Sequence, residues 1–156
     1  MLRETIAISS NLTTATTAYS TGDQMGGLLQ WDLATELRGC SGIILGLTAI
    51  DESAVLGPFD LFLFNAAVTP AADNAAATFS AVDIRKAIGM FNFQAANIST
   101  VVGGAVGYVL PVSGGGPFRL DDLGTSMYGC MVARSANPVF AAGSTSVRIK
   151  INVQYQ

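Results

Sequence analysis

The chain contains no histidine, and this absence excludes several kinds of active site at once. Histidine is the usual general base beside a nucleophilic serine or cysteine, and it is the commonest metal ligand. The sequence also lacks the G-x-S-x-G motif of a serine nucleophile and the glycine-rich P-loop that binds nucleotide phosphates. We therefore expect that the protein is not an enzyme and that it binds no cofactor.

Charged residues are scarce as well, at 12% of the chain against about 25% in a typical soluble protein. The net charge is −3, and the 8 Lys and Arg residues are scattered, with Arg85 and Lys86 as their one adjacent pair. Nucleic acid binding usually needs a basic patch, so we expect no nucleic acid partner. With few charges to solvate a monomer, the composition favours a protein that is covered by partners.

Long apolar runs and cysteines are also few. The most apolar stretch, residues 42–50, is far shorter than the ~20 residues of a membrane-spanning helix, and the first residues do not resemble a signal peptide. We expect no membrane partner and no secretion. Cys40 and Cys130 are too few for a disulfide framework and have no metal-ligand spacing. We expect two buried thiols, with a disulfide between them as the alternative.

What the sequence does contain is a series of short apolar runs separated by turn residues, which is typical of a β-sandwich or barrel. Strands are predicted at residues 5–9, 25–33, 42–50, 59–64, 90–93, 104–112, 126–133 and 145–155. One short helix is predicted at residues 80–88, with Ser80 as N-cap, Asp83 at the third helical position and Gly89 as its stop. We predict an all-β fold, an antiparallel, jelly-roll-like β-sandwich of about eight to nine strands.

One globular domain is expected, in which residues 1–18 form an N-terminal strand and arm and residues 19–156 form the sandwich. Residues 12–21 are rich in Thr, Ala and Ser and poor in core-forming side chains. Such a segment gains little by folding onto its own domain. We therefore expect this arm or the strand at residues 5–9 to contact a partner, for example by adding to a neighbour's sheet edge.

Two pairs of adjacent carboxylates occur, Asp51 with Glu52 and Asp121 with Asp122. Adjacent residues on a strand point to opposite faces, so these pairs do not converge as an acid–base site would require. We expect solvated loop ends and no metal, with a calcium site at Asp121 and Asp122 as the alternative. The glycines at 103–104 are interpreted as a turn, and residues 113–117, with the glycines at 114–116, as a flexible turn.

The predicted strands carry more aromatic residues than one buried face of each strand would hold. The candidate interface residues are Trp31, Phe62, Phe64, Phe91 and Phe93. Symmetric self-association would cover them, so we expect a homodimer or homotrimer. The alternative is that they fill the core of the single domain.

One segment, from Tyr19 to Gly27, has the form Tyr-x-x-Gly-Asp-x-x-Gly-Gly and leads into an apolar strand. Its defining residues are Tyr19, Gly22, Asp23, Gly26 and Gly27. The first Gly-Asp pair suits a tight turn, and the Gly-Gly pair suits a bulge or a close backbone approach. These are structural requirements and not catalytic ones.

This segment resembles a motif near the start of the capsid decoration, or cement, proteins of tailed bacteriophages. Later landmarks follow in a similar order: Ser41-Gly42 before a strand, the strand from Asp60 to Phe64, Asp73-Asn74 before a short helix, Ser126 to Gly129, and an alternating last strand. The resemblance implies a structural virion protein, made in the host cytoplasm. It would sit on the outer capsid surface and stabilise the shell by binding the major capsid protein.

Two other functions remain open. One is a tail or baseplate structural component. The other is a carbohydrate-binding β-sandwich, for which Trp31, Tyr108 and Tyr128 are the plausible aromatic platforms.

Overall fold

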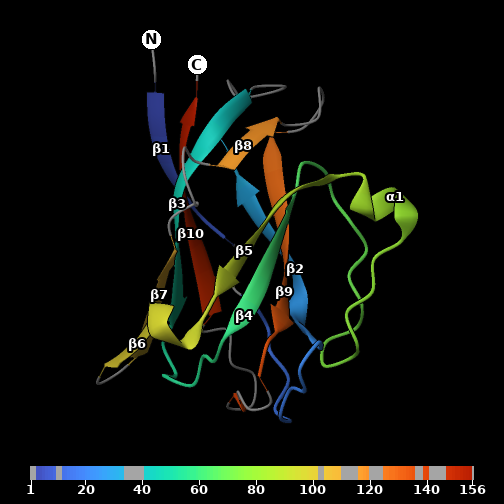
Figure 1. Cartoon of the computed structure of the whole chain (residues 1–156), viewed down its shortest axis with the longest axis vertical. Coiled ribbons are helices and arrows are strands. Elements are labelled where there is room, and N and C mark those ends of the chain that lie inside the picture. Colours follow the sequence, from blue (N-terminus) through green and yellow to red (C-terminus); the bar gives the residue numbers. More distant parts are fainter. Residues whose placement is uncertain are drawn as a thin grey trace.

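The computed structural model describes residues 3–9, 12–33, 41–101, 104–109, 116–119, 125–135, 139–140 and 147–155. Strands dominate these residues (Figure 1). The strands are β1 (Arg3–Ile8), β2 (Gln24–Asp32), β3 (Ser41–Asp51), β4 (Phe59–Phe64), β5 (Ala87–Phe93), β6 (Ile98–Val101), β7 (Gly104–Val109), β8 (Gly116–Arg119), β9 (Ser126–Ala133) and β10 (Val147–Tyr155). A short helix α1 (Ala81–Ile84) and a 3-10 turn η2 (Ala95–Asn97) complete them.

The strands form two sheets. The six-stranded sheet has the order β1-β10-β3-β7-β6, with β8 beside β3, and the four-stranded sheet has the order β2-β9-β4-β5. All pairings are antiparallel, and four of them are nested along the chain: β1 with β10, β2 with β9, β3 with β7, and β4 with β5. One long hairpin rolled up across two sheets produces this nesting, which is the jelly-roll topology. The predicted antiparallel β-sandwich is confirmed.

The main core lies between the sheets and follows from strand alternation. On β10, Val147, Ile149, Ile151 and Val153 are fully buried, and the polar residues between them are half-exposed. Side chains alternate across a strand, so this pattern places one face of β10 against the four-stranded sheet and the other toward solvent.

A second, smaller core lies on the outer face of the four-stranded sheet. Phe64, Val68 and Cys130 are buried there, and Phe62 and Phe79 pack against them. The ring of Phe79 lies 5.4 Å from the rings of both Phe62 and Phe64. The connection between β4 and α1 therefore covers this face, which explains why β4 is apolar on both sides.

Helix α1 is shorter than predicted. The Ser80 hydroxyl accepts a hydrogen bond from the Asp83 backbone N–H at 3.1 Å, which confirms the predicted N-cap. The helix ends at Ile84, however, and residues 87–89 already belong to β5, where Ala87 lies opposite Phe64 and Gly89 opposite Leu63. Pairing with β4 extends the strand into the predicted helix, so Gly89 is not its stop.

Two short strands were not predicted. β6 pairs with β7, and β8 pairs with the first half of β3. The predicted flexible turn at residues 113–117 is wrong for Gly116 and Pro117, which lie in β8, and residues 113–115 fall outside the described residues. Within the described part, β8 pairs on one side only, where a proline without an N–H is tolerated.

The N-terminal segment packs onto its own domain. β1 pairs with β10 along its length, and the Leu12 N–H donates to the Val147 carbonyl at 3.0 Å. Leu12 and Tyr19 are almost fully buried, at 2% and 1% exposure. The expectation that this arm gains little from its own domain is therefore wrong, because these two large side chains anchor it.

No helix within the described ranges has the length and apolar character that crossing a membrane requires.

Candidate binding site

The motif around Tyr19 forms a hydrogen-bonded joint. The Tyr19 hydroxyl donates to Asp73 Oδ1 at 2.6 Å and accepts from the Ala15 N–H at 2.7 Å. The same carboxylate oxygen accepts from the Gly26 N–H at 2.6 Å. Burial, together with this bond to Asp73, raises the pKa of Tyr19 above its ordinary value, so the hydroxyl remains a donor. The joint ties the arm, the start of β2 and the long connection before α1 together.

The glycines of the motif meet different demands. Gly22 and Gly26 adopt positive φ angles of 94° and 65°, which favour glycine. A Cβ at Gly26 would lie 2.4 Å from Leu12 Cγ, whereas a Cβ at Gly27 would meet open space. Asp23 closes the turn by accepting from the Ser20 N–H at 2.7 Å. The motif therefore shapes the backbone and presents no reactive group.

Replacing Gly26 by alanine should lower the free energy of unfolding by roughly 2 kcal/mol, because the positive φ and the overlap with Leu12 both disfavour a side chain. Urea denaturation would measure this loss. Gly27→Ala is the matched control and should change stability by less than ~0.5 kcal/mol. Equal losses at the two positions would contradict the assigned role of Gly26.

Four of the five aromatic candidates lie inside the protein. Trp31 and Phe93 are fully buried, and Phe64 and Phe91 are 1% and 8% exposed. Phe62 is partly buried against Phe79. The expected interface role is therefore wrong for the four buried side chains, which fill the core of the domain as the alternative stated. Val68 and Phe79 could have indicated this burial from the sequence, because they are apolar residues in a connection that otherwise has the composition of a polar loop.

Asp51 and Glu52 lie in different environments and do not converge. Asp51 is fully buried and accepts from the Val55 and Leu56 N–H groups at 2.8 Å, so it is not the solvated loop end that we expected. Glu52 is exposed and pairs with Arg148 at 3.0 Å. Asp121 and Asp122 lie outside the described residues. Within the described ranges, no group of three or more His, Cys, Asp or Glu side chains could hold a metal ion.

Cys130 is a buried free thiol, and burial raises its pKa to about 12. Such a thiol is unreactive at neutral pH, because the thiolate is the reactive form. Cys40 lies outside the described residues.

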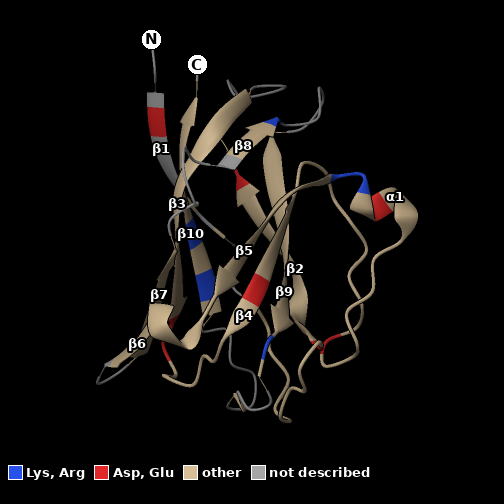
Figure 2. Cartoon of the chain, in the orientation of Figure 1, with Lys and Arg blue, Asp and Glu red and all other residues tan. Residues whose placement is uncertain are grey.

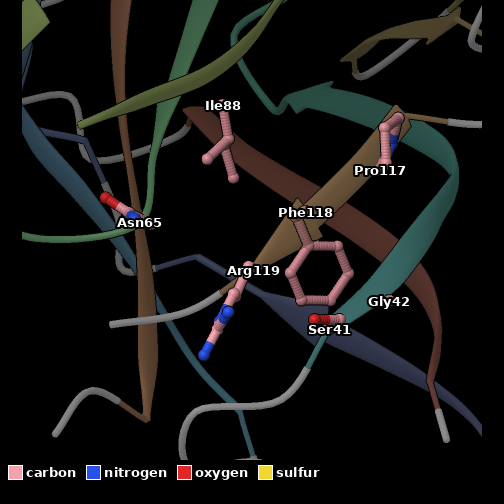
Figure 3. Close-up of a pocket in the computed structure, with 7 residues that line it drawn as sticks. All are labelled: Ser41, Gly42, Asn65, Ile88, Pro117, Phe118 and Arg119. Atoms are coloured by element: carbon pink, nitrogen blue, oxygen red, sulfur yellow. The ribbon is translucent and has the colours of Figure 1, made fainter. Parts of the chain in front are cut away.

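A pocket of about 420 Å³ opens at one end of the sandwich, where β3 begins and β4 and β8 end (Figure 3). Its lining is Ser41, Gly42, Asn65, Ile88, Pro117, Phe118 and Arg119. Gly42 leaves room for the Phe118 ring, since a Cβ there would lie 2.8 Å from that ring. Among the described residues of this lining, Arg119 is the one cation, Asn65 is the one amide, and none is a carboxylate.

A smaller and more enclosed groove of about 150 Å³ lies on the six-stranded sheet. It is lined by Gly46, Thr48, Tyr108, Lys150 and Asn152. Tyr108 is 51% exposed, so of the three candidate platforms for a sugar ring it is the one that reaches the surface most fully. Trp31 is buried, and Tyr128 packs against the second core.

Three exposed apolar side chains lie on α1 and β5, two consecutive elements of the chain. Val82 and Ile84 are 63% and 59% exposed on a helix that projects from the body of the sandwich (Figure 1), and Met90 on β5 is 51% exposed. We call these three residues the apolar edge. Charges are sparse over the ribbon as a whole (Figure 2).

No family model matches the chain, and no curated protein matches it. Weak structural neighbours exist. The structure of BuGH86wt in complex with neoagarooctaose is 8% identical with a TM-score of 0.39, and the match covers 97% of this chain but 19% of that one. Desmodium yellow mottle tymovirus is 10% identical with a TM-score of 0.34, covering 99% of this chain and 86% of that one.

A low-affinity xylan-binding module, CBM86, from Roseburia intestinalis is 10% identical with a TM-score of 0.25, and the match covers 100% of this chain and 95% of that one. The weak neighbours thus include viral coat structures and a carbohydrate-binding module. All three TM-scores are below 0.5, so these likenesses carry no argument about what this chain does.

Proposed function

We propose that this protein is a non-catalytic structural protein of a virion, which sits on the outer surface of a phage capsid and stabilises it by binding the major capsid protein. The order of motifs that resembles the decoration proteins supports this. The contact between Tyr19 and Asp73 agrees with it, because two landmarks of that resemblance meet in one hydrogen-bonded joint.

The observation that carries the proposal is the apolar edge. Exposed apolar side chains can mark a protein interaction site, and Val82 and Ile84 lie two residues apart on α1, with Met90 on the strand that follows. Within the described ranges, β5 pairs with β4 alone, so its other side can pair with a strand of a neighbouring protein. The edge therefore offers both apolar side chains and backbone hydrogen-bonding groups to a capsid subunit.

Self-association as a homodimer or homotrimer is part of the same proposal. The aromatic residues are mostly buried and do not support self-association. The exposed side chains of the apolar edge support it instead. An edge strand that pairs with its own copy produces a twofold contact. Sedimentation equilibrium of the isolated protein tests this part, and a monomer at high concentration would contradict it.

The test of capsid attachment is co-sedimentation of the protein with intact capsids and, separately, with purified tails. We expect it to pellet with capsids, and the double variant Val82→Ser with Ile84→Ser should weaken this binding by roughly tenfold or more, because apolar burial at the contact is lost. Both side chains are exposed, so the variant should remain folded.

Val139→Ser is the matched control, since Val139 is 50% exposed and does not belong to the apolar edge. It should pellet as the unmodified protein does. Binding to tails and not to capsids would favour the alternative of a tail or baseplate component. Unchanged capsid binding by the double variant would show that the apolar edge is not the contact.

A further inference from the structure

The groove on the six-stranded sheet brings together side chains from three neighbouring strands. Thr48 on β3 lies opposite Lys150 on β10 and opposite Tyr108 on β7, and Gly46 lies opposite Asn152. Opposed residues on paired strands share a face. The next residue on β3, Leu47, is fully buried in the main core, so the groove residues point away from that core.

Gly46 allows the Tyr108 ring to lie close to the sheet. A Cβ at Gly46 would be 3.1 Å from the Tyr108 hydroxyl oxygen and 3.5 Å from Cε2. Any side chain at this position would press against the ring. The ring can therefore rest over the glycine while half of the side chain stays exposed, which leaves an aromatic surface at the groove.

The polar side chains around this ring have unused hydrogen-bonding capacity. Lys150 makes no ion pair with any residue in the described part of the chain, whereas Arg148, two residues before it, pairs with Glu52. Within the same ranges, the side chains of Thr48 and Asn152 have no hydrogen-bond partner, and Asn152 Oδ1 is buried without one. One unpaired cation thus lies beside a hydroxyl, an amide and an aromatic ring.

We propose that this groove binds one pyranose unit that carries a carboxylate, as in an acidic polysaccharide. The C–H face of a pyranose packs against an aromatic ring, and its hydroxyls can bond to Thr48 and Asn152. Lys150 pairs with the carboxylate in a charge-assisted hydrogen bond. The volume of about 150 Å³ suits a single sugar ring, since drug-sized ligands occupy ~300 Å³ or more. This activity goes beyond capsid attachment and uses a different face.

The test is an NMR titration of the isotopically labelled full chain with oligosaccharides of galacturonic acid and, separately, of galactose. We expect the acidic sugar to bind roughly tenfold more tightly, because it gains a hydrogen bond to a charged group. Tyr108→Ala should abolish binding of both sugars, and Gly46→Ala should weaken both by displacing the ring. Tyr108→Phe, which keeps the ring, should bind within about threefold of the unmodified protein.

Lys150→Gln separates the charge from the ring. It should remove the preference for the acidic sugar, so that the acidic and the neutral sugar bind with similar affinity. The proposal is overturned if neither sugar shifts the groove residues, if both bind equally, or if Tyr108→Ala binds as the unmodified protein does. If the unmodified protein binds neither sugar and Tyr108→Ala no longer co-sediments with capsids, the groove would be assigned to a protein contact instead. Capsid co-sedimentation of the double variant Val82→Ser with Ile84→Ser tests the proposed function, and its outcome is independent of these sugar titrations.

Discussion

Trp31→Ala should lower the free energy of unfolding by roughly 3–5 kcal/mol, the usual loss for a fully buried large side chain. Trp31 is 0% exposed on β2, and its Nε1 donates to the Ile149 carbonyl of β10 at 2.8 Å. This bond joins the two sheets. A Cβ at Gly129 would lie 2.7 Å from Trp31 Cη2, so the neighbouring strand leaves room for the indole ring. Truncation would leave a large cavity between the sheets.

Urea denaturation followed by circular dichroism would measure this loss, because Trp31 is the one tryptophan and its fluorescence disappears with it. Trp31→Phe should cost less, about 1–2 kcal/mol, because most of the apolar volume remains. The Ile149 carbonyl also keeps its bond from the Ser9 N–H, at 2.9 Å. Tyr108→Ala, at an exposed aromatic residue, is the control. A similar small loss at both positions would contradict the core role of Trp31.

Asp51→Ala should lower the free energy of unfolding by roughly 3 kcal/mol, because it leaves several loop N–H donors, including the buried one of Leu56, without their acceptor. Asp51 ends β3 and is fully buried. Its Oδ1 accepts from the Ser53 N–H at 2.9 Å, and its Oδ2 accepts from the Val55 and Leu56 N–H groups at 2.8 Å. The carboxylate therefore holds the loop between β3 and β4 in place.

Glu52→Gln is the neighbouring control. Glu52 is exposed, and its pair with Arg148 lies at the surface, so the change should cost less than ~1 kcal/mol in a denaturation experiment. Hydrogen exchange would locate the effect, since residues 53–56 should lose protection in Asp51→Ala before the strands do. Equal stability of the two variants would indicate that the loop does not depend on Asp51.

The local patterns of the sequence determined the fold class. Alternation along residues 147–155 predicted a strand with one buried face, because side chains point to opposite sides of a strand. The predicted strands at 59–64 and 126–133 match β4 and β9 in full. The N-cap at Ser80 could also be predicted, since the cap and its Asp83 partner are three residues apart. The absence of histidine excluded histidine-based active sites from the sequence alone.

Only the tertiary structure decided what covers each face. Apolar residues on both sides of β4 indicated a second buried surface, but not whether a partner or the chain itself covers it. The connection carrying Val68 and Phe79 covers it, so Phe64 belongs to a core. The groove at Tyr108 likewise depends on Gly46, which is distant in the sequence and lies nearby through the pairing of β3 with β7. Such contacts depend on which strands pair, and local periodicity carries no information about that choice.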